Sequence, residues 1–133
     1  MLVYLCRHAQ AAPGTPDEER PLTDAGVAQA RMLGAHLAAA APRPSAVLSS
    51  PLLRARQTAA EVAAALSLTP EVDDRLSPGA TVADLSALAA EREGPFVTVG
   101  HQPDCSEIVL TLTGADPGFP VASMQRVELA GNP

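Results

Sequence analysis

Two histidines and two arginines of this chain each follow a short apolar run. Arg7 and His8 stand directly after one run, His101 follows a second, and Arg54 lies just beyond a third. Such runs are typical of strands that are buried on both faces of a parallel sheet. Because the ligand site of an open α/β sheet lies beyond the carboxyl ends of its strands, we expect these side chains to meet at one edge.

This combination of side chains suits phosphoryl transfer. Arginine stays charged and its forked donors match phosphate oxygens. A neutral imidazole is a good nucleophile near pH 7, and the nearby guanidinium groups should keep His8 unprotonated. His101 could donate a hydrogen bond to a phosphoryl oxygen in the transition state. A helix that opens near Pro51 would add backbone N–H groups at the same edge.

The elements that must position these residues alternate along the chain. Apolar runs predict strands at residues 2–6, 46–49, 96–99 and 124–129, with a weaker candidate at 72–76. Helical periodicity predicts helices from Thr23 to about 41, from Ser50 as N-cap to 66, from Thr81 to about 92, and from Asp104, in a capping box with Glu107, to about 114. This order predicts an α/β fold of three layers, α/β/α, with a mostly parallel central sheet in one domain spanning residues 1–133.

The composition narrows the possible functions. The chain has 133 residues, 47% of them apolar, and a formal charge of −6, which argues against a nucleic-acid partner. All nine basic side chains are arginine, so lysine-dependent chemistry is excluded. Arg7 interrupts the N-terminal apolar run too early for a signal peptide, and no apolar run approaches the length of a membrane span. We therefore expect a cytoplasmic protein with two reduced cysteines and no membrane partner.

Other phosphatase and hydrolase patterns are missing from the sequence. Neither Cys6 nor Cys105 has an arginine six positions later, as the tyrosine-phosphatase pattern needs. No Gly-x-Ser-x-Gly run occurs, and three histidines without clustered carboxylates or cysteines predict no metal site. We expect a metal-independent reaction without a cofactor.

Four segments, in order along the chain, resemble the motifs of the histidine phosphatase superfamily, also called phosphoglycerate-mutase-like. They are Cys-Arg-His-Ala-Gln-Ala at 6–11, Arg-Pro-Leu-Thr at 20–23 with a glycine at 26, Ser-Pro-Leu-Leu-Arg-Ala-Arg-Gln-Thr-Ala at 50–59, and Val-Gly-His-Gln-Pro at 99–103. In its small size and its Arg-Pro-Leu-Thr segment, the chain resembles the SixA-type branch of this family, the phosphohistidine phosphatases.

The resemblance implies a role for each candidate residue. His8 would be the nucleophile that is phosphorylated, while Arg7, Arg54 and His101 would form the phosphate pocket and Arg20 would line its rim. The chain departs from the SixA-type branch at residue 10, where a glutamine stands in place of the acidic residue common there.

Members of the family that cleave phosphate esters often carry a carboxylate just after the third strand, as proton donor to the leaving alkoxide. Here residues 76–80 contain no acid, and the charges at 17–19 and at Asp73 and Asp74 are interpreted as solvated. The imidazole that leaves phosphohistidine is far less basic than an alkoxide and needs less help. We therefore expect a phosphohistidine-bearing protein as substrate. The alternatives are a phosphatase for a small phosphorylated metabolite and a phosphate-binding module without turnover.

Overall fold

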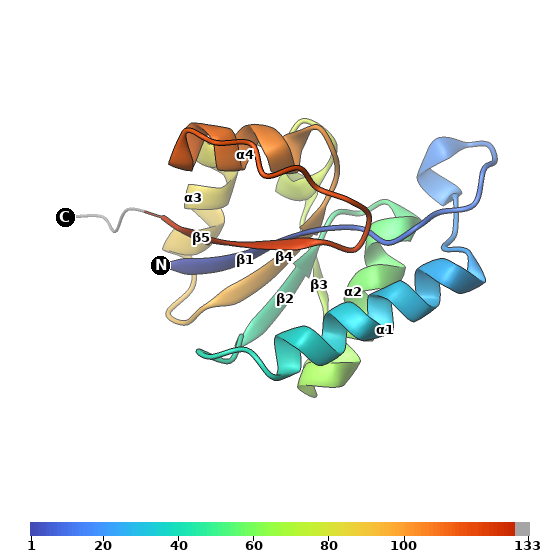
Figure 1. The fold of residues 1–133 in the computed structure, drawn as a ribbon, viewed down its shortest axis with the longest axis horizontal. Helices are drawn as coiled ribbons and strands as arrows, with labels where there is room; N and C mark the ends of the chain where they lie inside the picture. Colours follow the sequence, from blue (N-terminus) through green and yellow to red (C-terminus); the bar gives the residue numbers. More distant parts are fainter. Residues whose placement is uncertain (130–133) are drawn as a thin grey trace.

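The computed structural model describes residues 1–129, in which five strands and four α-helices alternate (Figure 1). The strands are β1 (Leu2–Arg7), β2 (Ala46–Ser49), β3 (Glu71–Val72), β4 (Phe96–Gly100) and β5 (Met124–Glu128). The α-helices are α1 (Asp24–Ala38), α2 (Leu53–Leu66), α3 (Val82–Ala90) and α4 (Asp104–Thr113), with 3₁₀ turns η1 (Asp17–Glu19) and η2 (Asp74–Leu76).

The strands form one sheet in the order β3-β2-β4-β1-β5. Among the strands of residues 1–129, only the edge strand β5 runs antiparallel, against β1, so the predicted mostly parallel sheet is confirmed. The register aligns Arg7 of β1 with Gly100 of β4, and Ser49 of β2 with Val99. The residues that follow these three strands therefore leave the sheet beside one another.

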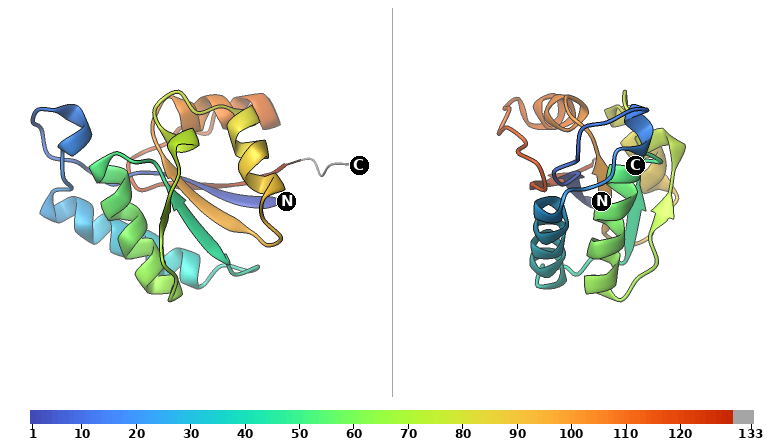
Figure 2. Two further views of the ribbon diagram at one scale, coloured as in Figure 1. Left: turned by 180° about the vertical axis from the view of Figure 1, so that it is seen from behind. Right: turned by 90° about the vertical axis from the view of Figure 1, so that its right-hand side faces the viewer.

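Helices cover both faces of the sheet. Along β1, Tyr4 and Cys6 pack with side chains of α1 and α2, whereas Val3 and Leu5 pack with side chains of α3 and α4. This alternation follows from the two-residue period of a strand and explains why the strand is apolar throughout. Figures 1 and 2 show the resulting three layers, with α1 and α2 side by side on one face. The predicted α/β/α fold is confirmed.

The first and third α-helices begin where their caps predict. The Thr23 hydroxyl accepts the Gly26 N–H at the start of α1, and Thr81 forms a capping box with Asp84 at the start of α3. Both helices end slightly before the predicted residues, at Ala38 and Ala90.

Ser50 is not the N-cap of α2. The helix begins at Leu53, because the chain continues in the sheet direction at Ser50, whose N–H donates to the Val99 carbonyl. The Ser50 hydroxyl is bound to His101 and accepts the Leu52 N–H, so it makes a local turn before the helix.

The predicted capping box at Asp104 is wrong as well. Helix α4 starts at Asp104 itself, after Pro103, and the Asp104 carboxylate accepts the N–H groups of Gly79 and Ala80. The carboxylate therefore holds the loop after η2 instead of capping the helix to which Asp104 belongs.

The weak strand candidate at 72–76 is mostly not a strand. Only Glu71 and Val72 pair with β2, and the 3₁₀ turn η2 follows. Asp73 caps that turn and binds Arg75 with both carboxylate oxygens, so its interpretation as a solvated strand-edge charge is wrong.

The two cysteines are free and buried on opposite faces of the sheet, and burial raises the pKa of both thiols. None of the helices at residues 1–129 combines the length and apolar character needed to cross a bilayer.

Candidate active site

His8 is the first residue after β1, and the main chain holds it from two sides. Its N–H donates to the Gly100 carbonyl, and its own carbonyl accepts the Ala122 N–H, each at 3.0 Å. The ring nitrogen Nδ1 lies 2.7 Å from the Ala9 carbonyl oxygen. Because a carbonyl can only accept, Nδ1 carries the proton of the neutral ring and Nε2 has its lone pair available.

The surroundings of His8 favour the neutral ring. Burial is the main cause that lowers its pKa, and the positive charges of Arg54, Arg7 and Arg20 act in the same direction. The bond to the Ala9 carbonyl opposes these effects. The sequence predicted the effect of the guanidinium groups, and the structure adds burial as the larger cause.

His101 follows β4 and faces His8, with the two ring centroids 5.3 Å apart. Its Nε2 lies 2.7 Å from the Ser50 hydroxyl, and its buried Nδ1 has no protein partner within residues 1–129. Burial lowers the pKa of His101 to about 4, and repulsion by Arg54 and by the protonated form of His8 acts in the same direction. The ring is therefore neutral at pH 7, and it can donate a hydrogen bond from one nitrogen.

Arg7 is the last residue of β1 and contacts the loop that precedes β5. Its Nη1 donates to the Phe119 carbonyl at 2.8 Å, and its buried Nε has no protein partner in the described part of the chain. Two more main-chain bonds join this loop to the end of β1, at Ala122 and Ser123. Sequence reasoning missed this loop because it contributes carbonyl and amide groups of the main chain, and these leave no signal in side-chain type.

Arg54 lies in the first turn of α2 and is only 8% exposed. Its Nη1 donates to the Asp17 main-chain carbonyl at 2.9 Å, and its Nη2 donates to Asp17 Oδ2 at 3.2 Å. Arg20 donates from Nη1 to Asp17 Oδ1 at 2.9 Å and from Nε to the Ala12 carbonyl. Asp17 therefore bridges the two arginines with one carboxylate.

The acids at 17–19 are exposed, as the interpretation of a solvated loop predicts. That interpretation missed a contact, because the Asp17 carboxylate binds two predicted site residues, Arg20 and Arg54. Its hydrogen bond with Arg20 is the main cause that lowers the Asp17 pKa, and Arg54 adds to the effect. No periodicity marks a single acid in an irregular loop, so the sequence carried no signal for this contact.

Hydrogen bonds and close contacts join the loop between β1 and α1 to helices α1 and α2. The Thr23 hydroxyl donates to Gln10 Oε1, and the Gln10 carbonyl passes so close to Gly26 that a Cβ there would overlap its oxygen. Gln57 of α2 accepts the Leu22 N–H at 2.7 Å. These contacts hold the segment that carries Arg20 and Asp17 over the carboxyl end of the sheet (Figure 1).

The structure thus brings the predicted side chains to one edge, where Arg7 and Arg54 lower the pKa of both His8 and His101 and Arg20 lowers that of His8. Within residues 1–129, no group of three or more His, Cys, Asp and Glu side chains is placed to hold a metal ion.

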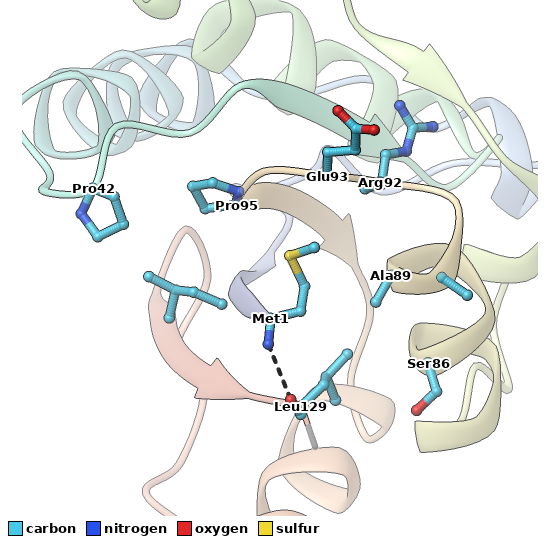
Figure 3. A pocket seen from close by; sticks show the side chains of 10 residues that line it. Met1, Pro42, Ser86, Ala89, Arg92, Glu93, Pro95 and Leu129 are labelled. Carbon is cyan, nitrogen blue, oxygen red and sulfur yellow. Dashed lines mark hydrogen bonds between the residues drawn. The ribbon is translucent and has the colours of Figure 1, made fainter. Parts of the chain in front are cut away.

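A hollow of about 650 Å³ lies at the opposite end of the parallel strands (Figure 3). The start of β1, the end of α3 and Leu129 line it, and the Met1 ammonium group donates to the Leu129 carbonyl at 3.1 Å. None of the histidines and arginines at the carboxyl edge contributes to its wall.

The arrangement at the carboxyl edge can do a particular kind of chemistry. A neutral imidazole with a bare Nε2 stands among three guanidinium groups and a second neutral imidazole. Such a set can bind a tetrahedral dianion and attack its central atom.

Comparison with known proteins points in the same direction. The family model described as "Histidine phosphatase superfamily (branch 1)" matches residues 3–78. An uncharacterised protein of Picosynechococcus is 39% identical over 80% of this chain and 70% of its own length. Phosphohistidine phosphatase SixA of Escherichia coli K12 is 33% identical over 97% of this chain and 86% of its own. A solved structure of the protein histidine phosphatase SixA complexed with tungstate superposes with a TM-score of 0.85, covering 97% of this chain and 88% of that one at 33% identity.

Proposed function

The chain belongs to the histidine phosphatase superfamily, in its SixA-type branch, and from that premise we propose that it removes phosphate from phosphohistidine on a protein, with His8 as nucleophile. The observation that carries the proposal is the neutral His8 ring, which donates from Nδ1 to the Ala9 carbonyl and has Nε2 free, beside Arg7, Arg54 and His101. The solved SixA structure contains tungstate, a tetrahedral oxyanion of the same shape as phosphate.

In the first step His8 Nε2 attacks the phosphorus, a new N–P bond forms, and the N–P bond of the substrate breaks. The substrate imidazole, which carries a proton on its other ring nitrogen, leaves as a neutral imidazole with the electron pair of the broken bond. In the second step water attacks the phosphorus of phospho-His8, the His8 N–P bond breaks with its electron pair returning to Nε2, and dihydrogen phosphate leaves, so that the neutral His8 ring is restored. Arg7, Arg54 and His101 donate to the equatorial oxygens in both steps, and Arg20 contacts the substrate at the rim.

The position of Asp17 bears on the choice of substrate. Its carboxylate lies at the arginine-rich edge, but Arg20 and Arg54 hold its pKa below the ordinary value. The charged carboxylate predominates at neutral pH and has no proton to give to a leaving alkoxide. An imidazole leaving group requires less protonation than an alkoxide, so this site favours N–P bonds over O–P bonds.

The test measures phosphate release from a phosphohistidine-bearing protein and from glycerol phosphate, whose leaving group is a basic alkoxide, using the wild type, His8→Ala and His36→Ala. His36 is an exposed histidine of α1, so its variant controls for the loss of any imidazole. We expect fast release from phosphohistidine by the wild type and by His36→Ala, and none by His8→Ala. A rapid-quench experiment should trap an acid-labile phosphoryl group on the wild type and none on His8→Ala.

Each other result has a definite meaning. Equal turnover of both substrates, lost in His8→Ala, would keep the nucleophile and favour the small-molecule phosphatase. Undiminished turnover in His8→Ala would refute the proposed nucleophile. A wild type that binds phosphate but releases none from either substrate would favour the binding module.

A further inference from the structure

Thr58 of α2 is fully buried beside the loop that carries His8. Its hydroxyl makes two hydrogen bonds, donating to the Arg54 carbonyl at 2.8 Å and accepting the Ala9 N–H at 3.0 Å. A hydroxyl has one hydrogen, and Arg54 receives it, so a lone pair of the oxygen is left for Ala9. The bond within the helix therefore orients the hydroxyl as an acceptor toward the His8 loop.

The bond to Ala9 leads directly to the nucleophile. Ala9 is fully buried, its N–H is held by Thr58, and its carbonyl accepts the proton of His8 Nδ1 at 2.7 Å. That carbonyl decides which ring nitrogen is protonated and which is bare. A shift of the Ala9 main chain would weaken this bond, and the ring would then be free to rotate or to exchange tautomers.

The same hydroxyl also connects the two parts of the site. Arg54 and Thr58 lie one turn apart on α2, and the Ala9 segment follows β1. The helix does not need the Thr58 side chain, because the Arg54 carbonyl is placed to accept the Thr58 N–H as in any α-helix. The side-chain bond is therefore available for setting the distance between the His8 loop and the turn that carries Arg54.

We propose that Thr58 is a positioning residue for His8: through the Ala9 main chain it keeps the proton on Nδ1 and the Nε2 lone pair directed at the phosphate. The role in turnover depends on His8 being the nucleophile, as proposed above. The effect on the His8 ring does not depend on turnover, so the two proposals can be tested separately.

The experiment compares wild type, Thr58→Val and Thr58→Ser by long-range ¹H–¹⁵N NMR of the histidine rings and by steady-state kinetics on phosphohistidine. Valine has the shape of threonine without the hydroxyl, whereas serine keeps the hydroxyl. Thr111→Val is the matched control, because Thr111 donates the same kind of bond to the carbonyl four residues earlier, on α4. His8→Ala identifies the His8 ring signals, and thermal melts of each variant verify folding.

In the wild type, Thr58→Ser and Thr111→Val, we expect the His8 ring to be protonated at Nδ1 and bare at Nε2. In Thr58→Val the two ¹⁵N shifts should move toward each other, because the two tautomers exchange. We expect kcat of Thr58→Val to fall by about tenfold to 100-fold, as a small misplacement of a reacting group does, with KM nearly unchanged because Arg7, Arg54 and His101 still bind phosphate.

A folded Thr58→Val with wild-type ¹⁵N shifts would overturn the proposal. A Thr58→Ser variant that loses the Nδ1 tautomer would overturn it too, and this result can be obtained even where Thr58→Val does not fold. If the shifts move as expected while His8→Ala keeps full turnover, Thr58 positions the ring and the proposed function is what fails.

Discussion

Replacement of Arg54 tests the electrostatic design of the site most directly. Its two terminal nitrogens both donate to oxygens of Asp17, so the guanidinium is placed to make two hydrogen bonds to one partner at once. Hydrogen bonds to charged groups contribute about 1.5–3 kcal/mol each, so two such bonds to a phosphoryl group amount to about 3–6 kcal/mol. Arg54→Ala should therefore lower kcat/KM by about 10²–10⁴-fold.

Arg54→Lys separates charge from geometry. Lysine keeps the positive charge but offers a point donor in place of a fork, so it should recover one of the two bonds. We expect its kcat/KM to lie about 10–100-fold below the wild type. Arg56→Ala is the matched control, because Arg56 is an exposed neighbour whose side chain donates to the Pro51 carbonyl.

The assay is phosphate release from a phosphohistidine-bearing protein, with circular dichroism and thermal melts to verify folding. A folded Arg54→Ala that stays within threefold of the wild type would refute the reasoning, since the buried guanidinium would then have no part in transition-state binding. Equal activities of Arg54→Ala and Arg54→Lys, both well below the wild type, would show that the charge alone contributes nothing.

Three further predictions follow from the same contacts. The NMR titration midpoint of His8 should lie below 6.5 and should rise in Arg54→Gln, which removes a depressing charge; a wild-type midpoint above 6.5 would contradict this. Because the His101 pKa of about 4 lies below its unfolded value, the free energy of unfolding falls as pH falls from about 6.5 toward 4. Urea unfolding should show that the wild type loses about 2 kcal/mol more of this free energy between pH 7 and pH 5 than His101→Asn does. Gly26→Ala should destabilise the fold by about 1–3 kcal/mol in the same assay, because its Cβ would meet the Gln10 carbonyl oxygen. A loss below about 0.5 kcal/mol, which is the scatter of neutral surface substitutions, would show that the loop moves to accommodate the methyl group.

Strand and helix positions could be predicted because they depend on local pattern. The apolar runs that end before Arg7, before Ser50 and at Gly100 became β1, β2 and β4, and the caps at Thr23 and Thr81 begin α1 and α3. The misassigned caps at Ser50 and Asp104 are polar groups that a distant partner uses instead, His101 in one case and the loop at 79–80 in the other. A capping rule considers only near neighbours in the chain, so it cannot detect such competition.

The sequence by itself placed His8, Arg54 and His101 at the carboxyl edge of the sheet, because each follows a predicted parallel strand, but periodicity does not order the strands. The pairing of β1 and β2 with β4 is what makes the three strand ends neighbours. The tertiary structure decided what Arg54, Arg7 and His8 touch: Asp17 on Arg54, the Phe119 carbonyl on Arg7, and the Ala9 carbonyl on the His8 ring. Two of these partners are main-chain carbonyls, which every residue has, and the third is an acid in a loop without periodicity. Their roles depend on a chain path that only the packed elements define, because hydrogen bonds require ångström-scale placement that residue type and spacing do not encode.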